Sequence, residues 1–99
     1  MIAFGFFKGL PHKHSTEDFD AYKQYKNQIA KNKVIMHIES LERWNTSLPS
    51  YDMFTGEPLD AGIYKDGEFV FPLEFLHFYK KYDIGIPPHY EEYLQTVLN

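Results

Sequence analysis

The chain has 99 residues, a hydrophobic fraction of 43% and a formal net charge of −4, which fits one soluble globular domain spanning residues 1–99. Because it contains no cysteine, disulfides, thiolate metal sites and Cys nucleophiles are excluded, and a reducing compartment, the cytoplasm, is expected. No apolar run approaches the roughly 18 residues that cross a bilayer, so no membrane partner is expected.

The first half of the chain predicts a strand, a helix and a second strand. Alternating apolar residues predict a strand over residues 2–7 rather than a signal peptide. Ser15 is suited to cap a helix, and residues 16–31 follow it with early acids and apolar residues at helical spacing. Together these features predict a helix over residues 16–31. Residues 34–39 alternate between two faces, which predicts a strand.

The second half shows clearer local signals. Residues 51–54 predict a short strand, and residues 62–71 predict a hairpin that turns at Asp66-Gly67. Aromatic residues at helical spacing predict a helix over residues 72–82, and a last helix begins at Pro88. The order of elements predicts an α+β fold in which about three helices pack on a small, mainly antiparallel sheet.

Charge divides unevenly between the two halves. Residues 1–49 hold seven Lys/Arg and five Asp/Glu, whereas residues 50–99 hold three Lys and nine Asp/Glu. An acidic half repels phosphate backbones and attracts basic protein surfaces. This argues against nucleic acid as the main partner, although Lys23, Lys26 and Lys33 keep a nucleic-acid-binding module as an alternative.

Three histidines keep an enzyme as another alternative. His12 and His14 are spaced to share a divalent ion, and with His37 they would supply acid–base groups for a His-dependent or metal-dependent reaction. No metalloprotease motif, nucleophile elbow, P-loop or dinucleotide fingerprint accompanies them. We therefore expect no enzyme activity and assign no catalytic residue, metal ligand or cofactor.

Aromatic residues make up 18% of the chain, an unusually high fraction, and most of them are expected to pack in the core while a few are exposed. Several of them lie in turn-rich sequence beside acids, and this combination favours recognition of a basic protein. The predicted partner-binding residues are Trp44, Tyr51, Asp52, Phe54, Glu57, Asp60, Tyr64, Asp66 and Glu68. A homodimer through exposed aromatics is compatible with this prediction.

The C-terminal third carries a resemblance. Residues 66–79, followed by Tyr82, Ile84, Ile86-Pro87 and Tyr90, resemble a hairpin–helix pattern of many small bacterial proteins, although Phe71 stands where Trp is common. Some of these proteins look like immunity proteins, which neutralise toxins of bacterial competition systems such as contact-dependent growth inhibition. The resemblance implies a toxin–antitoxin role. The leading hypothesis is therefore a non-catalytic, cytoplasmic immunity protein that covers the active site of a basic toxin, for example a nuclease.

Overall fold

Three helices, a 3₁₀-helix and six short strands make up the described part of the chain. The structure is a computed structural model that describes residues 1–98. Its elements are β1 (Ile2–Ala3), η1 (Phe19–Gln24), α1 (Lys31–Glu39), β2 (Trp44–Asn45), β3 (Ser50–Tyr51), β4 (Pro58–Leu59), β5 (Gly62–Asp66), β6 (Phe69–Pro72), α2 (Leu73–Lys81) and α3 (Pro88–Val97). None of the helices in this part of the chain is long and apolar enough to cross a membrane.

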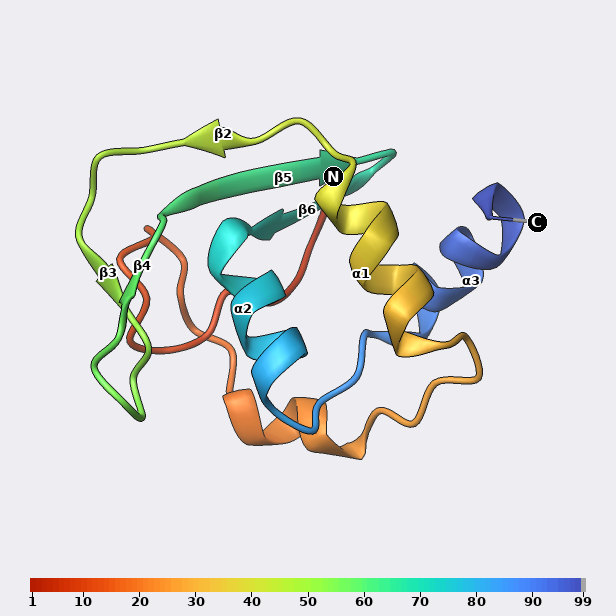
Figure 1. Ribbon diagram of the computed structural model, residues 1–99, viewed down its shortest axis with the longest axis horizontal. Helices are drawn as coiled ribbons and strands as arrows, with labels where there is room; N and C mark the ends of the chain where they lie inside the picture. Colours follow the sequence, from red (N-terminus) through yellow and green to blue (C-terminus); the bar gives the residue numbers. More distant parts are fainter. Residues whose placement is uncertain (99) are drawn as a thin grey trace.

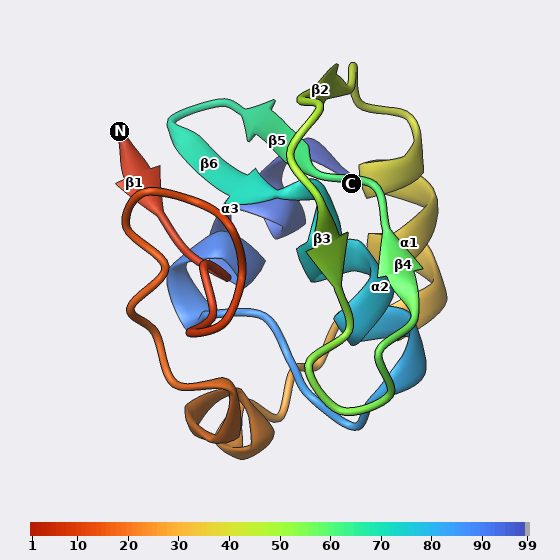
Figure 2. The same ribbon diagram turned by 90° about the vertical axis from the view of Figure 1, so that its left-hand side faces the viewer.

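The main sheet has the strand order β1-β6-β5-β2, and β3 and β4 form a separate two-stranded sheet. β1 runs parallel to β6, whereas the β6–β5 and β5–β2 pairs are antiparallel. Figure 1 shows α2 between this sheet and η1, and Figure 2 shows the N-terminal segment descending from β1 toward η1. The expected α+β fold with a mainly antiparallel sheet is confirmed.

The N-terminal strand and helix are shorter than predicted. β1 ends at Ala3, and the backbone turns at Gly5, whose φ of 77° favours glycine. The predicted helix over residues 16–31 is reduced to η1, because tertiary partners take the backbone groups that a longer helix would need. The N–H groups of Gln28 and Ile29 donate to the Glu91 carboxylate, and the Tyr22 carbonyl accepts from Gly85.

The strand predicted over residues 34–39 is wrong, because this segment is helical and forms most of α1. Val34 and Ile38, four residues apart, are buried, whereas Met36 points outward and is 69% exposed. In a run this short, apolar residues fit a period of two and a period of 3.6 equally well. Packing of α1 against α2 decides between them.

The C-terminal predictions are confirmed. β5 and β6 form the hairpin around Asp66-Gly67, with Tyr64 opposite Phe71. The predicted helix over residues 72–82 is α2, and the last helix begins at Pro88 as expected. Proline suits the first turn of a helix because its missing N–H would lack a partner there.

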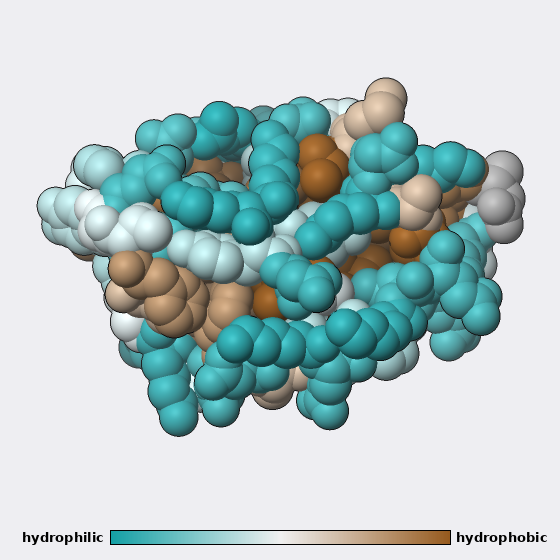
Figure 3. Space-filling model, turned by 60° about the horizontal axis from the view of Figure 1, so that its bottom comes forward, coloured by the Kyte–Doolittle hydropathy of each residue, from teal (hydrophilic) through white to brown (hydrophobic). Residues whose placement is uncertain are grey.

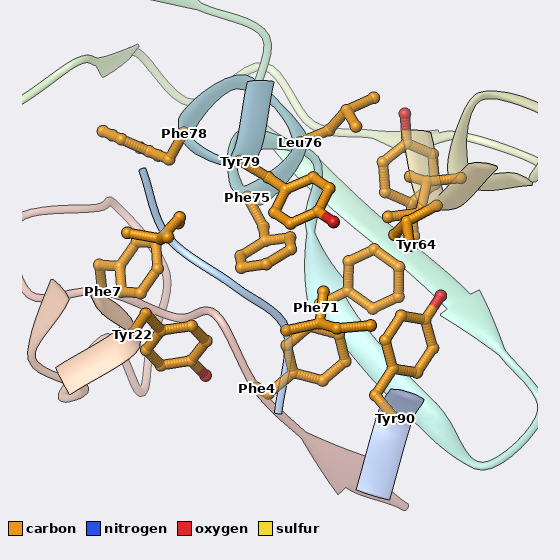
Figure 4. Close-up of a cluster of buried hydrophobic side chains, with 14 of the residues drawn as sticks. Phe4, Phe7, Tyr22, Tyr64, Phe71, Phe75, Leu76, Phe78, Tyr79 and Tyr90 are labelled. Atoms are coloured by element: carbon orange, nitrogen blue, oxygen red, sulfur yellow. The ribbon is translucent and has the colours of Figure 1, made fainter. Parts of the chain in front are cut away.

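Aromatic rings form most of the core. Phe75 is fully buried and contacts the rings of Phe4, Phe7, Tyr22, Phe71 and Tyr79. Figure 4 shows these side chains converging from α2, β6, η1 and the N-terminal segment. The Cα radius of gyration, 12.7 Å, equals that of a compact domain of about 100 residues, for which ~13 Å is expected.

Candidate contact surface and buried polar clusters

Large apolar side chains are exposed along one stretch of the chain. Trp44, Tyr51 and Phe54 are 50%, 54% and 55% exposed, and Leu48 and Met53 are also solvent-accessible. We call these five side chains the 44–54 surface. Figure 1 places their segment on the side of β2, β3 and β4, and Figure 3 shows one of several groups of hydrophobic atoms toward that side. Exposed apolar side chains that are this close in sequence are candidates for an interaction site in a soluble protein.

Backbone pairing holds this surface in place. Trp44 lies on the edge strand β2 opposite Ile63, and the Lys65 ammonium lies 5.1 Å from the centroid of its ring. Tyr51 lies on β3 opposite Pro58. The turn beyond β3 is closed by Asp52, whose Oδ1 accepts the N–H groups of Phe54 and Thr55 at 2.8 and 3.2 Å.

Phe54 links the turn to the core. Its ring lies 4.9 Å from Phe19 and 5.3 Å from Tyr82, both edge-on. One side of the ring is therefore packed while more than half of the residue faces solvent. The Phe54 side chain is thus anchored rather than free to move, which lowers the entropy cost of a contact.

Three predicted partner-binding residues are not on the surface. Tyr64 packs on Phe71 inside the core, and Asp52 and Asp66 are buried. The sequence predicts Asp66 in a hairpin turn and Asp52 in a short strand beside turn-rich sequence, where acids are usually solvated. Both carboxylates instead turn inward and accept hydrogen bonds from histidine and tyrosine. A partner therefore cannot contact these two acids directly.

The remaining predicted acids are exposed. Glu57 pairs with Lys81 at 3.2 Å and Asp60 pairs with Arg43 at 3.0 Å, while Glu68 lies on the β5–β6 turn. Three of the nine acids in residues 50–99, namely Asp52, Asp66 and Glu74, are buried. A third of the carboxylates in this half are therefore buried, so its surface carries less negative charge than the sequence indicates.

Each buried carboxylate is held by one histidine. Glu74 accepts from His12 Nε2 with both oxygens, at 3.0 and 2.9 Å, and from the Ser50 hydroxyl at 2.7 Å. The His12 contact joins the N-terminal loop to α2 across 62 residues of sequence. Because a carboxylate only accepts, Nε2 must carry the proton, so the contact fixes the His12 tautomer.

The same arrangement recurs twice. His37 Nε2 lies 2.8 Å from Asp66 Oδ2, which also accepts from the Tyr90 hydroxyl at 2.8 Å. His77 Nε2 and the Tyr82 hydroxyl both lie 2.8 Å from Asp52 Oδ2.

Hydrogen bonding shifts the pKa values of Asp52 and Tyr82. Burial raises the pKa of Asp52, but hydrogen bonds from His77, the Phe54 N–H, Tyr82 and the Thr55 N–H outweigh it and lower the pKa to about 2. Burial and the hydrogen bond to Asp52 raise the pKa of Tyr82 to about 12. No local sequence signal identifies these pairs, because their members lie 25 to 62 residues apart.

The three histidines of the alternative enzyme hypothesis, His12, His14 and His37, do not line one common site. His12 and His14 line a cavity of about 540 Å³ with Lys13 and Thr16, whereas His37 is bonded to Asp66 elsewhere. A possible metal cluster combines Asp52, Glu57 and His77, whose ligand atoms lie within 4.8 Å of one another. The Asp52 oxygens already accept four hydrogen bonds there, so the cluster is explained by its internal bonding.

Comparison of the chain with protein-family models, with curated proteins and with solved structures found no match. The function is therefore argued from the chemistry of the surface and its clefts.

Proposed function

We propose that the protein is a non-catalytic binding domain that acts as an immunity protein. In this proposal it neutralises a basic toxin, for example a nuclease, by covering the toxin's active site. The observation that carries the proposal is the 44–54 surface, where five large apolar side chains are exposed within eleven residues. Tryptophan and tyrosine are the residues that most often dominate binding energy at protein interfaces.

The charge around this surface is compatible with a basic partner. Glu57 and Asp60 follow the 44–54 surface in sequence, and both are exposed. Their bonds to Lys81 and Arg43 are exposed ion pairs, which contribute little to stability and exchange readily. Lysine or arginine side chains of a toxin cleft could replace these internal partners, and such charge pairing raises the association rate.

The test uses the toxin candidate encoded beside this chain. We expect that protein to arrest growth when expressed alone and to be harmless when the two are co-expressed. The purified pair should form a 1:1 complex at micromolar concentration. The activity of the toxin on plasmid DNA should fall in proportion to the amount of this protein that is added. A harmless neighbour, no complex, or a chain that only associates with itself would refute the proposal.

Variants locate the contact. Trp44→Ala and Tyr51→Ala should each weaken the complex by about 30-fold, because hot-spot truncations cost ~2 kcal/mol or more. Val97→Ala is the matched control, because Val97 is an exposed apolar residue on α3. Figure 1 shows α3 at the opposite end of the molecule from β3 and β4. Equal affinity of the wild type and both aromatic variants would exclude the 44–54 surface as the contact.

A further inference from the structure

A second feature of the molecule is a polar cleft between helices and strands. It has a volume of about 490 Å³ and opens between α1, α2 and the β4–β5 segment. Leu59, Leu73 and Leu76 supply apolar walls, while Arg43 and Lys80 supply positive charge. The 44–54 surface does not contribute a side chain to its lining. The cleft therefore shares none of the five side chains of the 44–54 surface, although the Arg43–Asp60 pair lies at its rim and borders both regions.

The Tyr64 hydroxyl lies at this cleft without a partner. Tyr64 is 4% exposed and lines the cleft, yet its hydroxyl makes no hydrogen bond to any residue of the described chain, 1–98. The hydroxyls of Tyr22, Tyr82 and Tyr90, in contrast, donate to carboxylates. Figure 4 shows the Tyr64 hydroxyl pointing away from the rings of Phe71 and Tyr90. A buried tyrosine normally has a partner for its O–H, so this donor is available for a ligand.

The oxygen of Tyr64 is accessible from the cleft. Among residues 1–98, Ser15 Oγ is the one fully enclosed side-chain polar atom without a hydrogen bond, so the Tyr64 oxygen is not sealed inside the core. Burial raises the pKa of Tyr64, Arg43 and Lys80 act against this rise, and Glu39 adds to it. Two cations and one carboxylate therefore act on the hydroxyl from the cleft walls.

The cations of the cleft can exchange their present partners. Arg43 bonds to Asp60 at 3.0 Å and Lys80 bonds to Glu39 at 2.7 Å, and all four side chains are substantially exposed. Exposed pairs of this kind hold weakly. The remaining carboxylate of the lining, Glu74, is already occupied by His12 and Ser50. An incoming anion would displace Asp60 from Arg43 and Glu39 from Lys80, and would then meet these two cations and one hydroxyl donor.

We infer that this cleft binds a compact ligand in which an oxyanion, a carboxylate or a phosphate, is attached to an apolar body. The oxyanion accepts hydrogen bonds from the Tyr64 hydroxyl, Arg43 and Lys80. The apolar body lies against Leu59, Leu73 and Leu76. Ligand sites typically combine such an apolar wall with a few converging polar groups. This inference goes beyond the proposed function and does not depend on it.

The experiment titrates the ¹⁵N-labelled protein with benzoate, phenyl phosphate and benzyl alcohol and follows amide shifts. Millimolar benzoate or phenyl phosphate should shift the amides of residues that line the cleft, and neutral benzyl alcohol should bind at least about tenfold more weakly, as expected for charged hydrogen bonds. Tighter binding of phenyl phosphate assigns a phosphate ester, and tighter binding of benzoate assigns a carboxylate. No shift with either anion, or equal binding of the alcohol, overturns the inference.

Variants test the residues themselves. Tyr64→Phe keeps the packed ring and should weaken anion binding about fivefold, the effect of one neutral hydrogen bond. Arg43→Gln should weaken it about tenfold or more, because its hydrogen bond is charged. Tyr25→Phe and Lys33→Gln, both outside the cleft, are matched controls and should bind as the wild type does. Thermal unfolding checks that each variant is folded, and a folded Tyr64→Phe protein with wild-type affinity would refute the assigned role of the hydroxyl.

Discussion

Asp52 has a different role in the structure from the one that the sequence predicts. As an acid beside Tyr51 in a predicted short strand next to turn-rich sequence, it fits a solvated contact residue. In the fold its side chain is fully buried and its two oxygens accept four hydrogen bonds. It therefore fixes the turn that carries Phe54 rather than contacting a partner itself.

A pH titration tests this role. The pKa of Asp52 is about 2 in the fold against 3.8 as a free side chain, so its ionised form stabilises the folded state. The contribution, about 2 kcal/mol, is complete above pH ~4 and disappears as the pH falls through ~2. Urea unfolding of the wild type between pH 2 and pH 6 should show this loss of free energy.

The control for the titration is Asp52→Asn. This variant keeps the shape of the side chain but cannot ionise, so its free energy of unfolding should change less with pH over the same range. It should also be less stable than the wild type at pH 6, because an amide cannot accept four hydrogen bonds in the same way. Parallel pH curves for the two proteins would show that Asp52 does not contribute as stated.

At the scale of elements, the β5–β6 hairpin is encoded locally. Its turn residue Gly67 has a φ of 60°, a conformation that side chains with a Cβ rarely adopt. The turn also supports α3, because the Tyr93 and Tyr90 hydroxyls donate to Asp66 in the same turn. A local signal in the sequence thus positions a helix that is distant in the chain.

Two glycine variants separate backbone strain from packing. Gly56→Ala places a Cβ in open space at a φ of 78°, so it should cost only the strain, about 1 kcal/mol. Gly67→Ala adds a clash, since its Cβ would lie 2.7 Å from the Tyr93 hydroxyl oxygen. Chemical unfolding should show a clearly larger loss of free energy for Gly67→Ala. Equal losses of unfolding free energy in the two variants would indicate that the Tyr93 side chain moves away from the new Cβ at no cost.

At the scale of the whole molecule, one aromatic core joins both halves of the chain. Phe75 on α2 contacts Phe7 and Tyr22 from the N-terminal half and Phe71 from β6. The buried His12–Glu74 pair makes a second connection between the same regions. The two halves are therefore expected to unfold together, as is usual for small single domains.

Removal of the central ring should destabilise the entire protein. Phe75→Ala leaves a cavity and should cost about 4 kcal/mol, a large part of the 5–15 kcal/mol typical of a domain. Circular dichroism during urea unfolding gives the midpoint, and far- and near-ultraviolet signals should change together. Met36→Ala, which truncates an exposed side chain, should move the midpoint little. Separate transitions in the wild type would contradict a single cooperative core.

The sequence by itself determined the elements whose signals are local. Asp66-Gly67 specifies the hairpin turn, Pro72 and Pro88 mark the starts of α2 and α3, and the aromatic content requires a ring-rich core. The exposure of Trp44, Tyr51 and Phe54 also agrees with their position in turn-rich sequence. Each of these features depends on backbone preferences or spacing within about ten residues.

Tertiary structure alone decided the conformation of residues 25–39 and the long-range contacts of the histidines and Tyr64. Packing against α2 made residues 31–39 a helix, and the Glu91 carboxylate and Asn27 contacts with Ile86 prevented a long helix after η1. The pairing of His12, His37 and His77 with buried carboxylates, and the exposure of the Tyr64 hydroxyl to a cleft, depend on residues far apart in the chain. Such contacts follow from the burial of the whole core, because a buried charge or hydroxyl takes whichever partner the fold brings to it.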